Sequence, residues 1–192
     1  MRNTVRLAIL TGAGLYASQA LAEPAGLDAL LPPIPKASAC YVRLYDAEHL
    51  KKHPKQKVTE MIFSLRYLTF EEEEDGSTPE DANYHYWFTL GAKLRNKPEM
   101  LYATGACGSY GGIGCGVDCD GGGVTLEPRT NGELLIRLDR EYTYIRMTPG
   151  CGDELEDGEM LEAGEDDKVF KLTKAPSAAC EAIEAEVAKG PE

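Results

Sequence analysis

Apolar and polar residues alternate in short runs over most of the chain between residues 39 and 173, and this pattern predicts β-strands. The run 58–70 shows the alternation clearly, because Met61, Phe63 and Leu65 share one face while Ser64 lies on the other. Turn-forming residues, many of them glycine or asparagine, separate the runs. The predicted strands are 39–45, 58–70, 84–95, 100–106, 123–127, 134–138, 142–147 and 169–173.

A helix is predicted after the last strand, from Pro176 and Ser177 to about residue 188. In it, Cys180, Ile183 and Val187 recur at positions i, i+3 and i+7, which gives one narrow apolar stripe for docking. Seven or eight antiparallel strands followed by one helix predict a mainly β fold, a small antiparallel β-barrel, since closure removes exposed strand edges. A β-sandwich is the alternative. The plan of a barrel with a docked C-terminal helix is similar to that of lipocalin-like proteins.

The N-terminal residues predict export. Arg2 and Arg6 precede an uncharged apolar stretch that ends in a small-residue cleavage site at residues 20–22, so we interpret residues 1–22 as a secretory signal peptide. Residues 23–38 hold four prolines and predict an extended lead-in. Residues 39–190 then form a single disulfide-bonded β domain, with no membrane span after cleavage, in the periplasm or outside the cell.

The six cysteines fit that compartment, because disulfides persist in exported proteins. Their spacing matches neither a zinc knuckle nor a C-x-x-C redox motif, so we expect three structural disulfides. A staple between the first strand and the last helix joins Cys40 to Cys180. A hairpin turning near residue 113 places Cys107 opposite Cys119, which leaves Cys115 for Cys151.

Acidic residues are concentrated in two segments. Residues 71–81 hold seven acidic residues and residues 152–167 hold nine, and neither segment has a basic one. Nucleic acid is therefore an unsuitable partner, since phosphate binding needs a clustered basic surface. One hypothesis for the acidic segments is that the protein inhibits a basic enzyme, such as a lysozyme, by presenting residues 71–75 to its cationic cleft.

The segment 105–123 is rich in glycine, with nine glycines in nineteen residues, but it has no lysine for a phosphate-binding loop. Its glycines are typical of crowded backbone around disulfides. Asp118 and Asp120 resemble the start of a calcium loop, yet the EF-hand pattern is not continued. Calcium binding by an envelope protein is an alternative in which a Cys115–Cys151 bond brings in carboxylates from residues 153–157.

No catalytic motif is present. His49 and His53 could share a helical face with Asp46 near it, but no H-E-x-x-H motif accompanies them. We therefore expect a non-catalytic binding protein without a cofactor, which holds a small molecule or a periplasmic envelope protein. Aromatic rings with polar tips and strand arginines are its candidate ligand-binding residues. They are Tyr86, Tyr142, Tyr144, Arg66 and Arg146.

Overall fold

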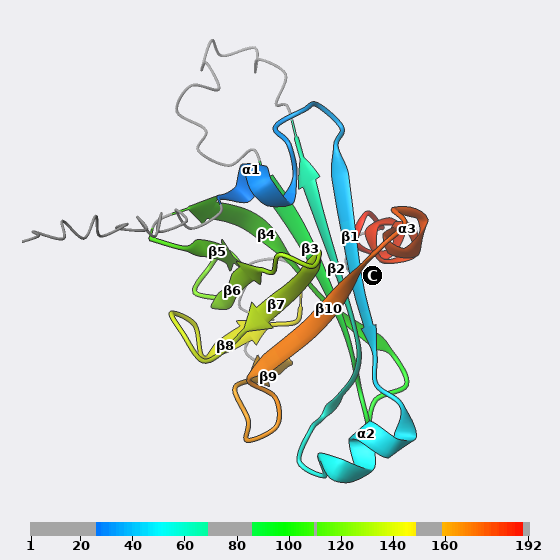
Figure 1. Ribbon diagram of the computed structural model, residues 1–192. Coiled ribbons are helices and arrows are strands. Elements are labelled where there is room, and N and C mark those ends of the chain that lie inside the picture. The colour runs from blue at the N-terminus through cyan, green and yellow to red at the C-terminus, as the bar shows by residue number, and fades with distance from the viewer. Residues whose placement is uncertain (1–25, 69–85, 110, 149–158, 190–192) are drawn as a thin grey trace, which may run out of the picture.

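The computed structural model describes residues 26–68, 86–109, 111–148 and 159–189, and its main feature is a closed antiparallel barrel (Figure 1). The barrel strands are β1 (Ser38–Leu44), β2 (Val58–Tyr67), β3 (Tyr86–Leu94), β4 (Met100–Ser109), β5 (Ile113–Gly116), β6 (Gly123–Pro128), β7 (Glu133–Arg137) and β10 (Val169–Ala175). Consecutive strands pair from β1 to β7, and β10 closes the barrel between β7 and β1. The predicted barrel is confirmed, and the β-sandwich alternative is wrong.

The remaining elements lie around this barrel. They are α1 (Leu27–Leu30), α2 (Ala47–Lys52), the two-stranded ribbon of β8 (Tyr144–Arg146) and β9 (Met160–Glu162), and α3 (Ala178–Val187). Figure 1 shows α1 and α2 at opposite ends of the barrel and α3 on its outside, beside β1 and β2. None of the helices in the described part of the chain has the length and apolar character needed to cross a membrane.

The predicted inner faces are confirmed by burial. Met61, Phe63 and Leu65 on β2 are completely buried, as are Phe88 and Leu90 on the neighbouring β3. The rings of Phe63 and Phe88 stack with their centroids 6.0 Å apart. Large apolar side chains from neighbouring strands thus fill the inside of the barrel, which is a common arrangement in eight-stranded barrels.

The end of the barrel near α1 has an apolar cap. Leu27, Leu30 and Leu31 are buried in the same core as the strands, and the Tyr86 hydroxyl donates to the Leu31 carbonyl at 3.1 Å. Residues 27–30 therefore form one helical turn where we expected extended chain. The turn ends at Leu31 because a proline, Pro32, disfavours helix in the residue before it, and Leu31 is extended.

Helix α3 docks on the outside of the barrel through its predicted apolar stripe. Cys180 and Ile183 are buried there, and Cys180 forms the expected disulfide with Cys40. Ile183 lies over Gly91, where an added Cβ atom would be 3.4 Å from its Cγ2 atom. The side chain of Glu184 accepts a hydrogen bond from Ser64 at the edge of this contact.

The glycine-rich segment differs from its prediction. β5 is a strand of the barrel, not part of a bend, and it pairs with β4 so that Cys107 lies directly opposite Cys115. These two cysteines form a disulfide, with 4.0 Å between their Cα atoms. The expected pairs Cys107–Cys119 and Cys115–Cys151 are therefore wrong. Cys119 is disulfide-bonded too, while Cys151 lies outside the described residues.

Candidate functional site

Arg43 faces the interior of the barrel near the end of β1. In the ladder between β1 and β2 it lies opposite Met61, which is completely buried. Residues directly opposite each other on paired strands point to the same face of a sheet, so Arg43 points inward as well. Unlike Met61, it keeps partial exposure to solvent. Its Nε atom is buried without a hydrogen-bond partner, so this inward cation has a donor to offer.

A column of stacked groups leads from Arg43 to the surface of α2. The guanidinium carbon of Arg43 lies 4.9 Å from the ring centroid of Tyr45. The Tyr45 ring is 4.7 Å from His49, which stacks on His53 at 4.4 Å. The side chain of Asp46 caps α2 by accepting a hydrogen bond from the His49 backbone at 2.7 Å. The i, i+4 spacing of the histidines then places both rings on one side of the helix.

Asp167 borders the same end of the barrel from the turn before β10. It is 1% exposed, and its carboxylate accepts hydrogen bonds from the backbone N–H groups of Lys57 at 2.6 Å and Val58 at 3.3 Å. Burial raises the pKa of Asp167, and the two N–H groups oppose that rise. We use the name α2 mouth for the group of Arg43, Tyr45, His49, His53 and Asp167.

Charges within the α2 mouth act on Tyr45. Burial raises the pKa of its phenol, the Arg43 charge and a hydrogen bond with the Arg43 side chain oppose this rise, and the Asp167 charge adds to it. Tyr45 is therefore a neutral phenol at physiological pH. It can donate a hydrogen bond beside a fixed positive charge.

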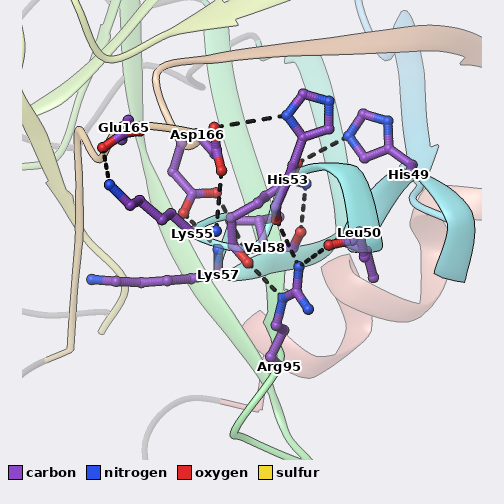
Figure 2. A network of polar contacts seen from close by, with 11 residues as sticks. His49, Leu50, His53, Lys55, Lys57, Val58, Arg95, Glu165 and Asp166 are labelled. Atoms are coloured by element: carbon purple, nitrogen blue, oxygen red, sulfur yellow. Dashed lines mark hydrogen bonds and ion pairs between the residues drawn. The ribbon is translucent and has the colours of Figure 1, made fainter.

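Polar contacts fix the loop between α2 and β2 around this site (Figure 2). Arg95 donates to the carbonyl oxygens of Leu50 at 2.7 Å, His53 at 2.9 Å and Gln56 at 2.6 Å. The Gln56 side chain is 3.0 Å from Nε2 of His49 and donates to the carbonyl of Val58. Arg95 and Gln56 thus hold the loop in place.

The turn before β10 is tied to the same loop. Asp166 accepts a hydrogen bond from the Lys55 backbone at 3.1 Å, and its carboxylate lies 3.7 Å from Nδ1 of His53. The Lys55 side chain pairs with Glu165. Figure 2 shows these contacts on one side of the histidine pair. The last acidic residues of the segment 152–167 therefore bind this chain's own basic groups.

Two of the predicted ligand-binding residues lie far from this mouth. The hydroxyl of Tyr86 holds the α1 cap through Leu31, and its ring packs edge-on against Tyr67 with centroids 5.1 Å apart. Arg66 is on the outside of the barrel, 3.9 Å from the carboxylate of Glu184 on α3. Both have structural partners, and although they are diagonal neighbours on the paired strands β2 and β3, their side chains point to opposite faces of the sheet.

The other three predicted residues lie near the glycine-rich strands. The ring of Tyr142 covers the backbone of β5 and β6, where an added Cβ at Gly123 would be 3.1 Å from it. Tyr144 donates its hydroxyl to the carbonyl of Asp120 at 3.0 Å. Arg146 is on β8, and its Nε atom is buried without a hydrogen-bond partner. The glycines thus serve close packing of aromatic rings.

The calcium hypothesis depended on a Cys115–Cys151 bond, and the structure has a different bond at Cys115. Asp118 and Asp120 lie in a tight turn in which Cys119 and Asp120 have φ of 57°. Cys115 is bonded to Cys107 and so cannot bring residues 153–157 to this turn. Among the residues that the structure describes, no three His, Cys, Asp or Glu side chains are arranged to hold a metal ion. Residues 153–157 lie outside that part of the chain.

Sequence reasoning found the pair of His49 and His53, whose rings do stack on one side of α2, but it missed Arg43, Tyr45 and Asp167, although β1 contains a signal. Ala39, Tyr41, Arg43 and Tyr45 occupy one face by period two. Three of the four are buried members of the barrel core. A charged residue on an otherwise apolar strand face is unusual, because burying a charge costs free energy without a partner. Asp167 has no such signal, since it follows several other acidic residues.

Comparison of this chain with protein-family models, with curated proteins and with solved structures gave no match.

Proposed function

We propose that this protein is an exported, non-catalytic binding protein of the periplasm or the extracellular space, and that it holds a small ligand at the α2 mouth. The difference between the two barrel ends supports the proposal. The α1 end is capped by buried leucines. The opposite end has an inward arginine that is partly exposed, next to a neutral phenol. A barrel of eight strands has room for one small ligand at most, and a polar mouth fixes its orientation.

The contacts of the titratable groups favour binding over catalysis. His49 is engaged by Gln56, and Asp167 accepts two backbone hydrogen bonds. A general acid or base needs a free position facing its substrate, whereas these groups hold the loop and the turn in place. The disulfides fit an exported protein, in agreement with the signal peptide predicted for residues 1–22.

Native mass spectrometry tests the proposal. The oxidised mature protein is purified from the periplasm of an expressing bacterium, and its mass is compared before and after extraction with organic solvent. We expect an additional small-molecule mass that extraction removes. Amide NMR spectra of the two samples should then differ at the end of β1, at α2 and at residues 165–167. A ligand that shifts the amides around α1 and leaves the α2 mouth unchanged would contradict the proposed location.

A second candidate function is supported by the filled interior. Phe63, Phe88 and Phe170 are among the large side chains that are almost completely buried, which favours a surface that binds a protein. The predicted inhibitor of a basic enzyme would use residues 71–75, which lie outside the described residues. Replacing residues 71–74 with glutamine should then abolish binding to lysozyme at low salt, and high salt should weaken the complex of the unaltered protein.

The native mass spectra also test calcium binding. Loss of the mass of one calcium ion on treatment with a chelator would support that alternative. An unchanged mass would remove it.

A further inference from the structure

The charge of Arg43 is the unusual property of the α2 mouth. Among the described residues, no ion pair includes Arg43, although Arg66, Arg129 and Arg137 each pair with a carboxylate. Its guanidinium lies over the ring of Tyr45 and shares a hydrogen bond with the Tyr45 phenol, but its buried Nε–H donates to no acceptor. A buried donor on a charged group is costly to leave unpaired, because it has lost its hydrogen bonds to water. An acceptor from outside the chain would remove that cost.

We propose that the ligand carries a single carboxylate group and that Arg43 is its anchor, an inference that rests on the proposed function. A guanidinium offers Nε–H and Nη–H in a planar fork that matches a carboxylate. The neutral phenol of Tyr45, on the same strand face two residues further on, is a second donor within the mouth. The buried side chain of Met61 lies opposite Arg43 on β2, and buried Leu172 precedes Thr173, the partner of Val42, on β10; both would contact the rest of the ligand.

The charges of the mouth favour a monoanion over a phosphate dianion. Asp167 is close enough to Tyr45 to act on its phenol, so a negative charge already borders the site. A single arginine compensates one ligand charge. A second ligand charge would meet repulsion from Asp167 in a poorly solvated place.

Arg146 is the other described arginine with a buried, unpaired Nε atom. It lies on β8 next to Ile145, which is completely buried in the barrel core. Because neighbouring residues of a strand point to opposite faces, the side chain of Arg146 points away from that core. Arg146 is therefore the matched control for Arg43, with the same unpaired donor in a different place.

The test uses the side-chain Nε–Hε resonances of the arginines in the oxidised mature protein. The unaltered protein is titrated with benzoate and acetate, and with benzamide and acetamide, which have the same shapes without the charge. Inorganic phosphate is the dianion probe. We expect the Arg43 resonance to shift to saturation as benzoate or acetate is added. Benzamide and acetamide should bind at least tenfold more weakly than the matching carboxylates. The Arg146 resonance should stay unchanged.

Variants give the second readout. Arg43→Gln should lose the ligand that co-purifies from the periplasm, whereas Arg146→Gln should retain it. Amide spectra show whether each variant is folded. If Arg43→Gln does not fold, the titration of the unaltered protein still tests whether Arg43 binds a carboxylate, because it needs no variant.

The outcomes separate the inference from the function on which it rests. The role of Arg43 would be overturned by a neutral co-purified ligand. It would also be overturned if benzamide and acetamide bound at the α2 mouth as tightly as benzoate and acetate. In either case the proposed binding function would still hold. Preference for phosphate would overturn the carboxylate. Absence of both a co-purified ligand and a shift with any probe would overturn the inference and the proposed function together.

Discussion

The two described disulfides should contribute very unequally to stability. Cys40 and Cys180 are separated by 140 residues, but Cys107 and Cys115 by only 8. In the chain-entropy model, closing loops of these lengths destabilises the unfolded chain by about 5 kcal/mol and about 2.5 kcal/mol. Replacing both cysteines of a pair with alanine should therefore lower the free energy of unfolding about 2.5 kcal/mol more for the long loop than for the short one.

The comparison is well controlled because all four cysteines are buried to the same degree. Cys40 and Cys180 are 1% and 2% exposed, and Cys107 and Cys115 are 1% and 0% exposed. The cavities left by the removed sulfur atoms should then cost similar amounts, and the difference between the double variants isolates loop closure. The hairpin disulfide also joins residues that the β4–β5 ladder already holds opposite each other.

Urea unfolding of the two double variants measures the difference. The variant without Cys40–Cys180 should have the lower free energy of unfolding and the larger m-value, since its unfolded chain is released over a longer loop. Equal losses, or a larger loss for the hairpin pair, would refute the loop-closure reasoning. Hydrogen exchange of the α3 amides shows whether the helix stays docked without its disulfide, as the contact of Ile183 with Gly91 predicts.

Four further variants test packing and titration. Ile183→Ala removes a side chain that is 3% exposed and should cost about 2–5 kcal/mol in urea unfolding. Gly105→Ala places a Cβ atom 2.0 Å from the Gly116 carbonyl oxygen, so its melting temperature should fall by several degrees, while Gly112→Ala, which meets nothing within 4 Å, should melt like the unaltered protein. The raised pKa of Asp167 means that its ionisation favours unfolding. The stability of the unaltered protein relative to Asp167→Asn should therefore fall as the pH rises from about 4 through the folded-state pKa, and a relative stability that rises with pH would contradict the burial argument.

The strand faces could be predicted because every second residue of a barrel strand is buried and therefore apolar, which gives the sequence a period of two. Met61, Phe63 and Leu65 recur at every second position, with polar Glu60, Ser64 and Arg66 on the other face, and this period is enough to place β2 and its inner face. The helix stripe of Cys180 and Ile183 follows the same logic with a different period. The Cys40–Cys180 pair then follows, because the apolar stripe of the last helix docks beside the first strand of the barrel.

Glycine removes that signal. In β5, Gly114 and Gly116 are the outward residues, and they carry no side chain that would reveal a period. The sequence therefore favours a bend at this strand, and this shifts the expected position of the hairpin turn. Once β5 is a strand, Cys115 must lie opposite Cys107. The wrong pairings are thus the consequence of one missed strand, not of a wrong rule about cysteines.

The α2 mouth was missed for a different reason. Its residues come from three places in the chain, and their meeting depends on barrel closure between β1 and β10. Only Arg43 is unusual in the sequence by itself, because it interrupts the buried face that Tyr41 and Tyr45 continue. A fold selected for stability alone would place an apolar residue there, since the buried Nε–H of the partly exposed Arg43 has no acceptor. That charge lies beside a neutral phenol, at the barrel end that has no apolar α1 cap. Its presence there is the strongest argument that this end of the barrel binds a ligand.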